Sequence, residues 1–96
     1  MPERLLDVSG LEAPEPLLRA IETLQSLERG EYLHLCHRMK PCHLYRFLED
    51  NGFHSDTRCG TEHECEVFVW HDGDTAAGVE AASAADSLKP WVDEQA

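Results

Sequence analysis

The feature that most constrains the fold is a pair of prolines placed between a short apolar segment and a long apolar stripe. The segment "RLLDV" (4–8) has the length and composition of a strand, and Ser9-Gly10 closes it. Pro16 suits the first turn of a helix, because its missing N–H would have no intrahelical partner there. We expect an amphipathic helix to follow and to end at Gly30. Its apolar residues recur every three or four positions: Leu17, Ala20, Ile21, Leu24 and Leu27.

The rest of the first 71 residues repeats this alternation of strand and helix. "EYLHLC" (31–36) alternates apolar and polar residues, which predicts a strand with one buried face. A second helix begins near Pro41 and ends at Asn51-Gly52, with Leu44, Phe47 and Leu48 as its apolar stripe. We read 53–59 and 64–71 as two strands joined by "GTEHE" into a hairpin.

The predicted fold is an α/β (α+β) two-layer sandwich of order β-α-β-α-β-β. Each helix has a single apolar stripe, so both should cover the same face of a mixed four-stranded sheet. Residues 1–71 form this domain. The remaining segment, 72–96, is rich in alanine and has six acids and one lysine, so we expect a mostly disordered tail with at most a frayed helix near 81–88.

The second face of the sheet is then open, and it would be aromatic. Five side chains have the right phase to lie on it: Tyr32, His34, Cys36, Phe68 and Trp70. A monomer rarely leaves such a patch in water, so we expect a protein partner or a second copy of the chain to cover it. The alternative is that the acidic tail folds back over it, for example through Trp91.

Charge and hydropathy narrow the classes of partner and the compartment. The chain has a net charge of −11, from 19 acidic and 8 basic residues, so it should be repelled by nucleic acid and by anionic membranes. No apolar run approaches membrane-spanning length, and "MPERLLDVSG" lacks the apolar core of a signal peptide. We therefore expect a soluble, cytoplasmic protein whose four cysteines are thiols or metal ligands.

The sequence resembles a known family in the corner between the first strand and the first helix, and in that helix. "LDVSGLEAPEPLLRAIETL" is similar to the opening of the TusA-like (SirA-type) small sulfur carriers, in which Cys-Pro-x-Pro precedes the first helix. "PCHLYRFLEDNGF" resembles a segment of a branch that lacks this cysteine and is found near haemerythrin-like or nitrogen-oxide-related proteins. In the carriers, that cysteine receives a persulfide sulfur. Here the matching position is Ala13, which has no thiol.

The resemblance therefore implies the fold but not an acceptor at the corner. We expect a non-enzymatic accessory or protein-interaction module in sulfur, redox or metal metabolism. The alternatives are a thiol-based sulfur carrier or redox protein that uses Cys42, and a small transition-metal-binding protein.

Cys42 is the candidate for reactive-thiol chemistry. It follows Pro41 at the start of the second helix, near Arg38, Lys40 and Arg46. The helix dipole and the positive charge would both favour a thiolate. The plainer interpretation is an exposed cysteine without a role.

The candidate metal ligands come from the same stretch. All ten cysteine and histidine residues fall between 34 and 71, and His37, Cys42 and His43 surround one predicted loop. Thiolate and imidazole donors suit zinc, copper or iron, although the chain has no Cys-x-x-Cys motif.

A second cysteine pair flanks the hairpin connection. Cys59 and Cys65 would face each other if the two predicted strands pair as a hairpin. They are then either a reversible disulfide, a metal site completed by His63, or two free thiols in a reducing compartment.

Overall fold

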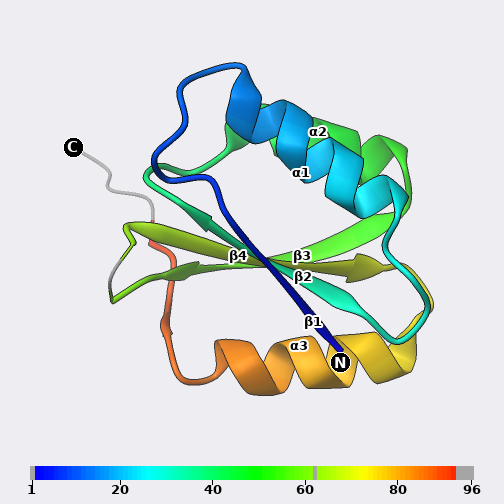
Figure 1. Ribbon diagram of the computed structural model, residues 1–96. Helices are drawn as coiled ribbons and strands as arrows, with labels where there is room; N and C mark the ends of the chain where they lie inside the picture. Colours follow the sequence, from blue (N-terminus) through cyan, green and yellow to red (C-terminus); the bar gives the residue numbers. More distant parts are fainter. Residues whose placement is uncertain (1, 62, 93–96) are drawn as a thin grey trace.

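The computed structural model describes residues 2–61 and 63–92 and consists of one mixed sheet with helices on both faces (Figure 1). The sheet order is β1-β2-β4-β3-β5, with β1 parallel to β2 and the other neighbours antiparallel. In chain order the elements are β1 (Glu3–Asp7), α1 (Glu15–Gln25), β2 (Tyr32–His37), α2 (Cys42–Asp50), β3 (Phe53–Cys59), β4 (Cys65–His71), α3 (Thr75–Ala85) and β5 (Lys89–Pro90).

The predicted order of elements is confirmed from β1 to β4, and α1 and α2 lie together on one face of the sheet (Figure 1). Pro16 is buried in the first turn of α1, as its missing N–H permits. The helix ends at Gln25 rather than at Gly30, because the N–H groups of Ser26 and Leu27 bond to carbonyls three residues back. Gly30 instead takes a positive φ of 86° in the turn into β2.

The main core lies between this pair of helices and the sheet. Its fully buried members are apolar side chains that alternate along the strands or recur along the helices, chiefly Val8, Ala20, Leu24, Leu33, Leu35, Leu44, Leu48, Val67 and Val69. This core fixes the starts of α1 and α2 beside the ends of β1 and β2.

The prediction of two layers and four strands is wrong in detail, because a third helix covers the opposite face of the sheet (Figure 1). The expected disordered tail is helical over Thr75–Ala85, and Lys89–Pro90 adds a short strand beside β3. The helix buries an alanine every fourth residue: Ala77, Ala81 and Ala85. Residues 93–96 belong to the expected tail but lie outside the described residues.

Asp74 caps the start of α3 and ties it to the turn before β2. Its carboxylate accepts hydrogen bonds from the N–H of Gly30 (2.7 Å) and of Ala77 (3.2 Å). These two bonds hold the pKa of Asp74 below its usual value, because they favour the charged form.

The aromatic face is therefore covered, not open. Tyr32 and Phe68 are only 5 % and 1 % exposed, and both pack with Ala81 and Ala85 of α3. A β-carbon at Gly78 would lie 3.0 Å from Nε1 of Trp70, so glycine lets the helix approach the sheet here. The alternative in which the tail folds back is the one observed.

The tail covers this face through alanines and not through Trp91. The Trp91 side chain packs against the main core, and the backbone N–H of Trp91 donates to the Thr57 carbonyl oxygen at 3.1 Å. Within 2–61 and 63–92, no helix combines the length and apolar character needed to cross a membrane.

Candidate functional site

The corner before α1 and the loop before α2 enclose a cavity of about 680 Å³. The core places these two helix starts side by side, since α1 and α2 pack on the same sheet face (Figure 1). The cavity walls are mainly apolar. The polar side chains of the cavity come from the end of β2, the loop after it and the start of α2: His37, Arg38, Lys40, Cys42 and His43.

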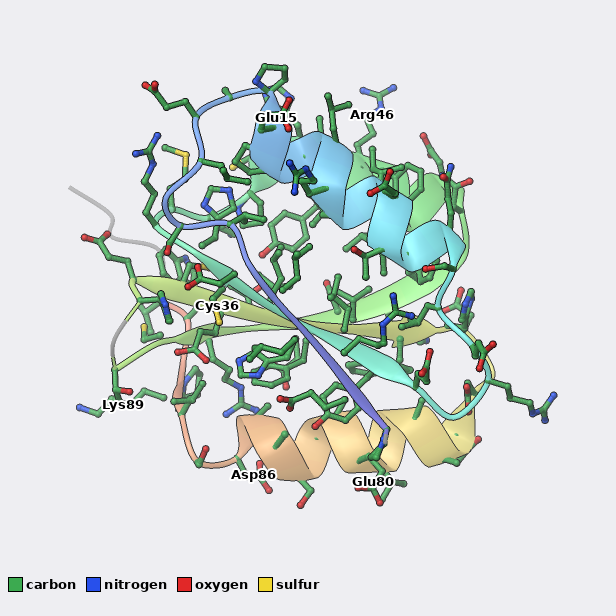
Figure 2. The ribbon with its side chains drawn as sticks, viewed as in Figure 1. Glu15, Cys36, Arg46, Glu80, Asp86 and Lys89 are labelled. Carbon is green, nitrogen blue, oxygen red and sulfur yellow. The ribbon has the colours of Figure 1, made fainter. Side chains whose placement is uncertain are left out.

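Ala13 and Cys42 line this same cavity. Cys42 is the first residue of α2 and is exposed, which confirms the predicted position of this thiol at a helix start. Arg38 and Lys40 also line the cavity. Arg46, by contrast, points away from the sheet into solvent (Figure 2) and is not a lining residue. The basic residues that line the cavity therefore come from the loop before the helix, and Lys40 Nζ lies 5.7 Å from the centroid of the Tyr45 ring.

His37 is the most buried polar side chain of the cavity, at 7 % exposure. Its Nδ1 accepts the N–H of Met39 at 3.2 Å, which assigns the ring proton to Nε2 in the neutral form. Burial, together with the nearby Arg38, lowers the pKa of His37. The ring therefore faces the cavity as a neutral hydrogen-bond donor.

The predicted metal ligands His37, Cys42 and His43 share this cavity but do not converge as a set of ligands. Within the described part of the chain, one group of three has all its ligand atoms within 4.8 Å of one another, and it is a different one: His34, Cys36 and Glu66. Cys36 and His37 lie on opposite faces of β2, as alternation predicts.

The group His34–Cys36–Glu66 lies on the sheet face that α3 partly covers. Cys36 stands opposite Glu66 in the pairing of β2 with β4, and both side chains are buried. His34 Nε2 lies 2.6 Å from Glu66 Oε1 and 3.9 Å from Cys36 Sγ. The His34 ring also stacks on Phe68, with centroids 4.4 Å apart. The ring is therefore held against both donors.

Alternation predicts that His34 and Cys36 share a face, and this is confirmed. The sequence pattern does not single out Glu66, because it is one of many glutamates in an acidic chain. The signal that finds it is its phase in β4, since Glu66 alternates with the buried Phe68 and the half-buried Trp70.

Cys59 and Cys65 are directly opposite each other across β3 and β4, which confirms that they face each other. Neither forms a disulfide. Burial, with a smaller contribution from Cys59, raises the pKa of Cys65 to about 12. His63 Nε2 lies 3.1 Å from Asp7 Oδ2, so the His63 ring contacts this carboxylate.

A second, polar depression of about 340 Å³ lies at the turn that starts α3. Its acid Asp74 already accepts two backbone N–H groups, and His71 Nε2 lies 3.2 Å from the Leu27 carbonyl oxygen. These contacts give the residues of this depression a structural role, which is to hold the start of α3.

Neither the curated proteins nor the solved structures contain a significant similarity to this chain, so the resemblance to TusA-like carriers stays a prediction. The match to a family covers residues 5–71, from β1 to the end of β4, and so includes the corner cavity and the group His34–Cys36–Glu66. The chain belongs to DUF2249, a family described as an uncharacterized conserved protein.

Proposed function

We propose that this protein is a non-enzymatic sulfur acceptor that works through Cys42, as an accessory protein of sulfur or redox metabolism. The observation that carries the proposal is that Ala13 and Cys42 line one cavity. The corner that holds the acceptor in TusA-like carriers has no thiol here, and the neighbouring helix start supplies one to the same space.

Accessibility separates Cys42 from the other three cysteines. Cys36 and Cys65 are buried, and Cys59 is half-buried with its thiol 3.6 Å from the Pro90 carbonyl oxygen. Persulfide transfer needs the attacking sulfur to approach a sulfur of the donor directly. Cys42 is the thiol that a donor protein can reach without opening the fold.

The surroundings of Cys42 suit an anionic sulfur. Cys42 is the first residue of α2, and the helix dipole favours negative charge at this end. Arg38 and Lys40 line the same cavity in a chain whose net charge is −11. The apolar side chains of Leu11, Leu17, Leu35 and Leu44 form the other walls. The cavity that Cys42 lines therefore combines apolar walls with basic residues, and both features would favour an anionic persulfide over its loss to water.

The proposed step is a balanced exchange between sulfurs. The Cys42 thiolate attacks the outer sulfur of a donor cysteine persulfide and forms a new S–S bond. The S–S bond of the donor breaks, and its inner sulfur leaves as a thiolate. One sulfur atom moves, and no external oxidant or reductant is consumed.

The other interpretations have less structural support. The interaction module depends on an open aromatic face, and α3 buries Tyr32 and Phe68 of that face. A metal site at His37, Cys42 and His43 needs ligand atoms that converge, and these do not form such a group. The cavity that Cys42 lines supports the alternative of a thiol-based sulfur carrier.

Intact mass spectrometry tests the proposal, with a cysteine desulfurase and L-cysteine as the sulfur source. The wild type should gain one sulfur atom, and Cys42→Ala should gain none. Cys59→Ala removes another thiol and should still load, so it serves as the matched control. Ala13→Trp keeps the thiol but fills the cavity, and it should load more slowly. Equal loading of the wild type and Cys42→Ala would refute the proposal.

A further inference from the structure

A second site on the opposite face of the sheet has the chemistry of a metal centre. It brings together an imidazole, a thiol and a carboxylate from two adjacent strands: His34, Cys36 and Glu66. Figure 2 shows Cys36 at the end of the sheet that carries the β3–β4 connection, away from the first turn of α3. Cys36 and Glu66 are 4 % and 7 % exposed, whereas the His34 side chain is 18 % exposed. The site is therefore mostly buried, and solvent reaches it at His34.

The spacing of the nitrogen and sulfur donors is close to that of a tetrahedral zinc site, and the carboxylate oxygen lies nearer to the nitrogen than such a site requires. Bond lengths of about 2.0–2.1 Å to nitrogen and about 2.3 Å to sulfur place the two ligand atoms about 3.6 Å apart. His34 Nε2 and Cys36 Sγ are 3.9 Å apart. The nitrogen and carboxylate oxygen of such a site are about 3.4 Å apart, whereas His34 Nε2 and Glu66 Oε1 are 2.6 Å apart. The Glu66 carboxylate therefore has to move about 0.8 Å away from His34 Nε2 to admit the ion.

A carboxylate also lies close to the far side of the imidazole. A histidine ligand usually directs its second ring nitrogen at a carboxylate, which fixes the ring and raises its basicity. His34 Nδ1 is buried and has no hydrogen-bond partner in the described part of the chain, and Glu3 Oε2 lies 3.4 Å from it. Glu3 is itself held by Tyr32, whose hydroxyl donates to Oε1 at 2.7 Å. A small shift of Glu3 would complete the carboxylate–imidazole–metal arrangement.

The backbone also leaves room for the Glu66 carboxylate. A β-carbon at Gly60 would collide with that carboxylate and with the carbonyl group of His63. Glycine at this position therefore lets the hairpin pass close over Glu66. The hairpin and the two strands together determine where the third donor lies.

We propose that His34 Nε2, Cys36 Sγ and Glu66 bind a single divalent transition metal ion of tetrahedral preference, and that Zn²⁺ is the ion this donor set fits best. Binding displaces a proton from the thiol and leaves His34 coordinating through an unprotonated Nε2, with its remaining proton on Nδ1 toward Glu3. Three protein donors leave a fourth position for a solvent molecule or a small ligand, as in zinc sites that are not purely structural. The site shares no residue with the cavity of Cys42.

Cobalt(II) substitution tests this site with a readout that a merely structural role would not produce. The untagged, reduced protein is titrated with Co²⁺ and then with Zn²⁺. Tetrahedral visible bands and a sulfur-to-cobalt charge-transfer absorption should appear and then be lost as Zn²⁺ displaces Co²⁺. Cys36→Ser should abolish the charge-transfer absorption, and His34→Gln or Glu66→Gln should weaken binding. Glu3→Gln keeps an oxygen that can accept the Tyr32 hydroxyl but removes the charge beside His34 Nδ1, and it should lower affinity by about 10–100-fold.

Cys42→Ser is the matched control and should leave the cobalt spectrum unchanged. A spectrum that is lost in Cys42→Ser and kept in Cys36→Ser would overturn the assignment, as would failure of the folded wild type to bind either ion. Circular dichroism of each variant shows whether lost binding reflects lost folding, and the wild-type spectrum decides whether a thiolate is a ligand. Sulfur loading of Cys42 is measured separately and does not depend on this result.

Discussion

Replacing Ala81 by glutamate tests whether α3 is packed on the sheet. Ala81 is fully buried against Tyr32 and Phe68, so a carboxyl group placed there has no polar partner. Burial without a partner raises a carboxyl pKa by about 3 units or more. At about 1.4 kcal/mol per unit, this lowers the free energy of unfolding by about 4 kcal/mol at neutral pH. A domain of this size has about 5–15 kcal/mol in total, so the variant should be close to unfolding.

Ala82 provides the matched control, because it is the next residue of the same helix and is exposed. Ala82→Glu should change the free energy of unfolding by no more than about 0.5 kcal/mol. Urea unfolding at pH 7, followed by tryptophan fluorescence, measures both variants, and Trp70 reports on contact with α3 through Gly78. If the two variants and the wild type share one urea midpoint, the helix does not pack on the sheet as described.

Three further predictions concern the core, the cap of α3 and the proposed metal site. Leu24→Ala removes a fully buried side chain and should cost about 2–5 kcal/mol, whereas Leu18→Ala on the exposed side of the same helix should cost little; equal urea midpoints would contradict this packing. The pKa of Asp74 is lowered in the folded state, so its contribution to stability is complete at pH 7 and is lost as pH falls below about 4. The difference in urea midpoint between the wild type and Asp74→Ala should therefore shrink at low pH, and a difference that grows would refute the capping role. Gly60→Ala should displace the Glu66 carboxylate and weaken Co²⁺ binding; unchanged cobalt affinity would separate the hairpin from the site.

The sequence predicted those elements whose buried side chains are large. Alternating leucines and valines identify β2 and β4, and leucines at helical spacing identify α1 and α2. The sequence did not predict α3 as a helix packed on the sheet, because its buried stripe consists of alanine methyl groups within an acidic segment. This stripe packs on the sheet because Tyr32 and Phe68 offer it large apolar rings and Gly78 admits close approach.

The candidate sites were predictable one strand or helix at a time. Alternation predicted that His34 and Cys36 share a face, and Pro41 predicted that Cys42 starts a helix. Bringing Glu66 to the first pair depends on β4 lying next to β2, which no local pattern specifies. The cavity that joins Ala13 to Cys42 likewise depends on how α1 and α2 pack.

The most direct test of the central claim is to map the transferred sulfur in the wild-type protein, where all four thiols compete. Trypsin cuts after Arg38 and Arg46, so the peptide 39–46 contains Cys42 alone, while Cys36 and the Cys59–Cys65 pair fall in other peptides. After one round of loading from a desulfurase persulfide, the additional sulfur should be found on 39–46. Sulfur on the peptide of Cys36 or on that of Cys59 and Cys65, or on none, would contradict the role proposed for Cys42.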